Sequence, residues 1–169
     1  MDVVEAARSG AARPAKPARS GWLALWLAGA AAFWSANLVI SLTPSAAAYR
    51  SALSIRYVPM LLEAAAGELI VAGVLALGLV RFPGRIPGAG PVRKALFLAV
   101  CALVVVTVLV EVPSKFGADV EDRGRWLFVA TVFNTVRVLA LGLAIGLVAR
   151  ARQTRADPHP LVRIKEKKP

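Results

Sequence analysis

Residues 126–148 read WLFVATVFNTVRVLALGLAIGLV, and this stretch decides the fold of the chain. It exceeds the length of about 20 apolar residues that a helix needs to cross a bilayer. Arg137 stands at its midpoint. A guanidinium in the hydrocarbon region is costly unless polar side chains or water surround it. We therefore expect the rest of the chain to supply polar partners at the depth of Arg137.

The composition of the whole chain is that of a membrane protein. It has 169 residues, of which 57% are hydrophobic and 18% are charged, whereas soluble domains are about 25% charged. Apolar segments predict four transmembrane helices, at about residues 22–42, 59–80, 95–112 and 126–148. We therefore expect an all-α integral membrane protein, with a four-helix bundle at residues 21–148.

The lysines and arginines predict how the bundle is oriented. The arm 1–20, the connector 81–94 and the tail 149–169 together carry 15 of them, whereas loops 43–58 and 113–125 carry 5. Cytoplasmic segments carry the excess of positive charge, so both termini are predicted to be cytoplasmic, the arm being disordered. The richness in Ala, Val and Arg indicates a bacterium, and we expect the inner (plasma) membrane. Tyr49, Leu53 and Tyr57 are spaced as on one face of an interfacial helix.

The net charge of +11 does not predict a nucleic-acid partner. The basic residues flank the apolar segments, as they do in proteins whose partner is an anionic lipid surface. The single cysteine, Cys101, lies in an apolar run, and the single histidine, His159, lies in the polar tail. We therefore expect the lipid bilayer as a partner, and we expect no disulfide, no metal site and no cofactor.

Polar side chains are expected to gather in the outer half of the bundle. The second and fourth segments both run inward, and at about 1.5 Å per residue they place Glu68 and Arg137 at similar depths. Glu68 shares a helix face with the small residues Ala64 and Gly67, which allows close helix approach. We therefore expect Glu68 and Arg137 to form an ion pair. The full expected set is Asn37, Glu63, Glu68, Thr107, Glu111, Asn134 and Arg137.

Two interpretations of this polar set stay open. Polar residues gathered at one depth are typical of a wet pocket, here opening to the outer side. The same residues could instead form a buried ion pair with amide and hydroxyl hydrogen bonds that fix how the helices pack. Gly142 and Gly146 form a GxxxG pattern, which favours close packing within the bundle or a homodimer through the last helix.

The last segment resembles that of the anthrone-oxygenase-like four-helix integral membrane family. That family commonly has an aromatic residue, then His or Asn, then two residues and an Arg; Glu111, Val112 and Pro113 are similar to its Asn-x-Pro at the end of the third helix. The residues of the last segment that carry the resemblance are Arg125, Trp126, Phe133, Asn134, Thr135, Val136 and Arg137.

The resemblance implies a function for some family members, the cofactor-free oxidation of aromatic polyketides. This chain has Asn134 where the family usually has His, and Glu111 where it usually has Asn. In this chain Glu68 or Glu111 would have to take the proton.

Three functions are compatible with the sequence. The first is a binding or accessory protein whose outward-facing pocket around Glu68 and Arg137 takes a small lipophilic ligand. The second is a membrane enzyme on a small lipophilic or aromatic substrate, with catalytic candidates Glu68, Glu111 and Arg137 as base and anion stabiliser. The third is a small transporter or channel subunit, which would work as an oligomer.

Overall fold

The computed structural model describes residues 19–117 and 120–156, and this part of the chain is helical with short connections. Its helices are α1 (Arg19–Ser41), α2 (Pro44–Ala52), α3 (Tyr57–Arg81), α4 (Pro91–Val106), the π-helical turn η1 (Thr107–Glu111), α5 (Val112–Phe116) and α6 (Arg123–Ala156). Four helices are long and apolar enough to cross a membrane. The expected four-helix membrane architecture is therefore confirmed. Most of the arm 1–20 and the end of the tail, with His159, lie outside the described residues.

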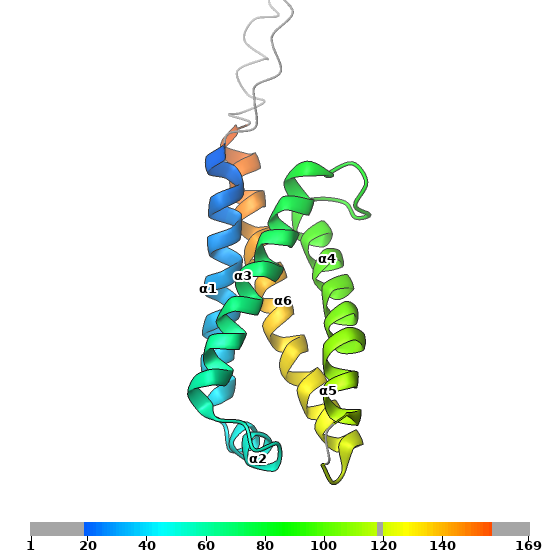
Figure 1. The fold of residues 1–169 in the computed structure, drawn as a ribbon. Coiled ribbons are helices and arrows are strands. Elements are labelled where there is room, and N and C mark those ends of the chain that lie inside the picture. The colour runs from blue at the N-terminus through cyan, green and yellow to red at the C-terminus, as the bar shows by residue number, and fades with distance from the viewer. Residues whose placement is uncertain (1–18, 118–119, 157–169) are drawn as a thin grey trace, which may run out of the picture.

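Helix α6 is the centre of the bundle (Figure 1). It packs mainly against α1 on one side and α4 on the other, while α3 packs mainly against α1 and contacts α4 and α6 much less. The start of α1 and the end of α6 lie at the same end of the bundle, since a Cβ added to Gly21 would lie 3.3 Å from Nη1 of Arg152. Helix α2 lies at the opposite end.

The tight core of the bundle lies in the half nearest the chain ends. Gly142 and Gly146 of α6 are buried there against α4. A Cβ added to Gly142 would lie 2.6 Å from Cβ of Ala99, and one added to Gly146 would lie 2.7 Å from Cα of Val92. The two glycines therefore serve helix packing within the chain, and α4 already covers the face that a homodimer through them would use.

The sequence predicted that the third membrane helix ends at Pro113. In the structure this helix continues to Phe116. It does so through η1, where the N–H of Val112 bonds to the carbonyl of Thr107, five residues back. In a regular α-helix the proline ring would clash with the carbonyl four residues earlier and offer it no N–H. The wider π turn accommodates Pro113, and the helix resumes beyond it. The last helix is also longer than predicted, since α6 runs on to Ala156.

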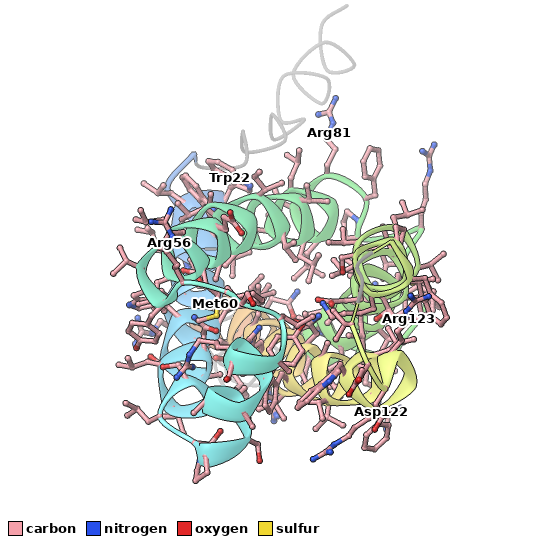
Figure 2. All side chains as sticks on the ribbon, turned by 60° about the horizontal axis from the view of Figure 1, so that its bottom comes forward. Trp22, Arg56, Met60, Arg81, Asp122 and Arg123 are labelled. Atoms are coloured by element: carbon pink, nitrogen blue, oxygen red, sulfur yellow. The ribbon has the colours of Figure 1, made fainter. Side chains whose placement is uncertain are left out.

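Helix α2 occupies much of the segment that was expected to be a loop. Thr43 caps it by accepting a hydrogen bond from the N–H of Ala46 at 3.2 Å, and Pro44 suits its first turn. The sequence predicted that Tyr49 and Tyr57 lie on one interfacial helix. In the structure Tyr49 is in α2, whereas Tyr57 is the first residue of α3. Figure 2 shows the bundle turned toward this end, with Met60 of α3 pointing to the middle.

Candidate ligand-binding pocket

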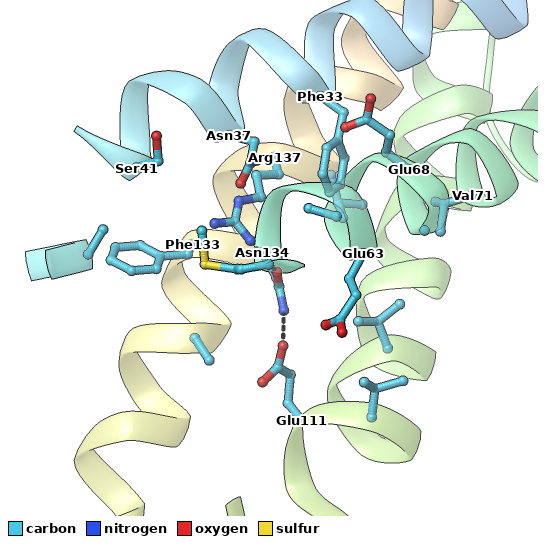
Figure 3. A pocket seen from close by; sticks show the side chains of 18 of the residues that line it. Phe33, Asn37, Ser41, Glu63, Glu68, Val71, Glu111, Phe133, Asn134 and Arg137 are labelled. Carbon is cyan, nitrogen blue, oxygen red and sulfur yellow. Dashed lines mark hydrogen bonds between the residues drawn. The ribbon is translucent and has the colours of Figure 1, made fainter. Parts of the chain in front are cut away.

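A cavity of about 460 Å³ lies at the α2 end of the bundle, among α1, α2, α3, α4, η1 and α6 (Figure 3). Six of the seven residues of the expected polar set line it; Thr107 does not, although its hydroxyl is buried nearby in the same helix as Glu111. The side chains that line the cavity and can form hydrogen bonds are Asn37, Ser41, Tyr49, Arg50, Glu63, Glu68, Glu111, Asn134 and Arg137. The sequence therefore predicted most of the polar lining, but not the contribution of α2.

A chain of polar contacts crosses from η1 to α6 on one side of the cavity. Asn134 donates a hydrogen bond from Nδ2 to Oε1 of Glu111 at 2.8 Å (dashed line in Figure 3). Arg137 donates from Nη1 to Oδ1 of the same amide at 3.3 Å. Asn134 therefore connects a carboxylate and a guanidinium that do not touch each other.

Lys115 is the cation that pairs with Glu111, and sequence reasoning missed it. Its Nζ lies 3.1 Å from Oε2 of Glu111 and 5.1 Å from the centre of the Tyr49 ring, and the residue is only 6% exposed. The sequence placed Lys115 in a loop because Pro113 was taken as a helix end. Its spacing of four residues from Glu111, typical of helical ion pairs, was the signal that could have found it.

The prediction that Glu68 and Arg137 form an ion pair is wrong. Within the described residues, Glu111–Lys115 is the ion pair of this region, and Glu68 is not within ion-pair distance of Arg137. Arg137 instead bonds Asn134 and lies 5.8 Å over the ring of Phe133. The two charges face the same cavity from α3 and α6, and Figure 3 shows them on different sides of it.

Several buried polar atoms around the cavity make no hydrogen bond to any described residue. They are Nδ2 and Oδ1 of Asn37, Oε2 of Glu68, Nε of Arg137 and Oγ1 of Thr107. Asn37 is 1% exposed and Glu68 is 5% exposed. A buried polar group without a hydrogen-bond partner lowers the free energy of unfolding by about 1–3 kcal/mol. These side chains therefore contribute little to the stability of the helix packing. The bundle presents donors and acceptors together to the cavity.

Tyr49 closes the α2 end of the cavity with an uncharged phenol. Its ring packs edge-on against Trp126 and Phe133, with ring centres 6.0 and 6.1 Å apart. Burial raises the pKa of the Tyr49 phenol above its ordinary value, so the hydroxyl keeps its proton at neutral pH. In the part of the chain that the structure describes, no cluster of His, Cys, Asp and Glu could hold a metal ion.

The comparisons with known proteins give no relative for this arrangement: no family model, no curated protein and no solved structure matches the chain. The resemblance to the anthrone-oxygenase-like family therefore stays a prediction. Three of the residues that carry that resemblance, Glu111, Asn134 and Arg137, are joined by hydrogen bonds in the structure.

Proposed function

We propose that this chain is a multi-pass membrane protein of binding or accessory type, whose ligand is a small lipophilic molecule with polar groups held in the cavity of Figure 3. The observation that carries the proposal is that three residues lining this cavity, Asn37, Glu68 and Arg137, have buried polar atoms without a protein partner. A ligand that donates and accepts hydrogen bonds would satisfy them. The cavity volume of about 460 Å³ is within the range of small-molecule sites, about 300–1,000 Å³.

The rest of the lining supports a ligand that is partly apolar. Between the polar groups, the cavity is walled by Phe33, Val71, Val106 and Val138. Small-molecule sites usually combine such apolar walls with a few polar groups that orient the ligand. We infer that the apolar walls contact the body of the ligand and that the polar set selects its functional groups.

The orientation of the cavity in the membrane is part of the proposal. The connector 81–94, with four lysines and arginines, lies at the end of the bundle opposite α2, where α1 begins and α6 ends. In the sequence, the basic arm precedes α1 and the basic tail follows α6. Under the positive-inside rule this end is cytoplasmic. The cavity then lies in the outer half of a bacterial inner membrane.

Gly67 provides a direct test of ligand binding in this cavity. It lines the cavity, and a Cβ added to it meets no atom within 4 Å, so Gly67→Leu fills space without a backbone clash. Gly124→Leu is the matched control, because Gly124 is also helical with open space around it but lies outside the lining.

The test is to purify the full chain and both variants from native membranes in mild detergent, and to identify bound small molecules by native mass spectrometry. We expect a molecule that co-purifies with the unsubstituted protein and with Gly124→Leu, and that is lost from Gly67→Leu. Equal occupancy in Gly67→Leu, or no bound molecule in the unsubstituted protein, would contradict the proposed function.

A further inference from the structure

Among the charged side chains that line the cavity and form no ion pair, the acidic ones come from a different helix than the basic ones. Glu63 and Glu68 both come from α3, whereas Arg50 comes from α2 and Arg137 from α6. Glu111 is already paired with Lys115. Of the described residues, none forms an ion pair with the other four side chains. Two carboxylates and two guanidiniums without an ion pair among the described residues therefore line the cavity. The carboxylate of Glu68 is buried, whereas Glu63 is exposed and points to the opposite side of α3 (Figure 3).

The two arginines are held in place by uncharged groups rather than by carboxylates. Arg50 donates from Nη1 to the carbonyl of Ser41 at 3.1 Å and lies 4.9 Å over the ring of Tyr57. Arg137 bonds the amide of Asn134, and its Nε has no partner. Both guanidiniums keep donors for an anion, and their planar geometry suits phosphate.

The mouth of the cavity is on the side of the bundle that faces lipid. Ile70 of α3 is 67% exposed and Val110 of η1 is 56% exposed, yet both line the cavity. A side chain that is exposed and also lines a cavity lies at its opening. Both belong to helices long and apolar enough to cross the membrane, and α3 contacts α4 little. The opening between α3 and η1 is thus bordered by apolar side chains at the level of the hydrocarbon.

We infer that the ligand is a zwitterionic amphiphile, with an ammonium and a phosphate in its head group, that reaches the cavity from the lipid phase between α3 and η1. This inference rests on the proposed function. The ammonium would lie against the buried carboxylate of Glu68, and the phosphate against Arg50 and Arg137. The amide of Asn37, which has both a donor and an acceptor without partners, lies among these groups. The chain of the amphiphile leaves past Ile70 and Val110.

Other charge types fit this cavity less well. A purely anionic ligand would leave the buried carboxylate of Glu68 without a counter-ion, and a purely cationic ligand would leave the two arginines without one. Unpaired charges are costly where the surroundings are poorly solvated. A zwitterion without an apolar chain would gain nothing from the apolar opening.

The experiment measures binding of four probes to the purified full chain in detergent, by native mass spectrometry and by the shift in thermal unfolding. The probes are lysophosphatidylethanolamine, the anionic lysophosphatidylglycerol and a cationic primary alkylamine, all of the same chain length, and O-phosphoethanolamine as the head group alone. We expect lysophosphatidylethanolamine to bind tightest. Glu68→Gln and Arg137→Gln should each weaken its binding by about tenfold or more, since each removes a charge-assisted contact.

Controls separate charge recognition from a general loss of structure. Glu121→Gln and Arg125→Gln change exposed charges outside the cavity and should leave the binding of lysophosphatidylethanolamine unchanged. Ile70→Trp keeps all the charges and obstructs the opening, so it should weaken binding of lysophosphatidylethanolamine while its circular dichroism spectrum stays that of the unsubstituted protein.

The inference is overturned if either singly charged amphiphile binds as tightly as the zwitterionic one, if the head group alone binds as tightly, or if Glu68→Gln and Arg137→Gln leave binding unchanged. These results leave the proposed function standing as long as Gly67→Leu still removes a co-purified molecule. If Gly67→Leu retains that molecule, the proposed function itself fails, whatever the probes show.

Discussion

Asn134 joins η1 to α6 by donating a 2.8 Å hydrogen bond to Glu111 while accepting one from Arg137. Asn134→Ala should therefore destabilise the protein by about 1–3 kcal/mol, because it leaves a partly buried acceptor and a partly buried donor without their partner. The measurement is thermal unfolding in detergent. Ser35→Ala, which removes an exposed hydroxyl bonded only to its own helix, should change stability little. An equal effect of both substitutions would contradict the bridging role of Asn134.

Lys115→Met should destabilise the protein by about 3 kcal/mol, because it strands the partly buried carboxylate of Glu111 without its cation. The double variant Lys115→Met with Glu111→Gln should recover most of this loss, since the glutamine keeps an oxygen for the amide of Asn134. A double-mutant cycle of unfolding free energies measures this coupling. Additive effects would show that the ion pair contributes nothing.

Glu68→Met should stabilise the ligand-free protein by about 1 kcal/mol, because it replaces a buried carboxylate oxygen that has no partner. The same substitution should abolish the binding of the co-purified ligand. Thermal unfolding of delipidated samples and native mass spectrometry give the two measurements. A loss of stability in Glu68→Met would mean that the carboxylate holds the helices together instead.

Gly146→Ala and Gly67→Ala should act in opposite directions. The added Cβ at Gly146 lies 2.7 Å from a backbone atom of α4 and forces the helices apart, which costs about 1–3 kcal/mol. At Gly67 the added Cβ meets open space, so the gain in helix propensity should stabilise by up to about 1 kcal/mol. The thermal unfolding midpoints of the two variants measure this difference. A lower midpoint for Gly67→Ala would contradict the open space around Gly67.

The predicted orientation can be tested with single cysteines in a Cys101→Ser background. Ser45→Cys in α2 should react with a membrane-impermeant maleimide in intact cells. Gly84→Cys, in the exposed connector at the other end, should react only after the membrane is permeabilised. The reverse pattern would turn the cavity toward the cytoplasm.

The sequence predicts the membrane helices and the depth of their polar residues well, because length, hydropathy and a fixed rise per residue determine both. It does not predict which polar groups meet. Glu68 and Arg137 lie at similar depths, but their distance depends on how far α3 stands from α6, which is a matter of tertiary packing. The sequence did not predict the contact of Lys115 with Glu111, because a proline usually marks a helix end. This helix continues past Pro113 only because of the π turn.

The π turn also makes the chemistry of the cavity depend on the number of residues in η1. Deleting one residue between Thr107 and Pro113 would turn everything that precedes the deletion by about 100° relative to everything that follows it. Either Glu111 or the whole of α4 would then face the wrong way, although the composition of the helix would hardly change. Homologous chains that share this pocket should therefore tolerate substitutions in η1 far better than insertions or deletions.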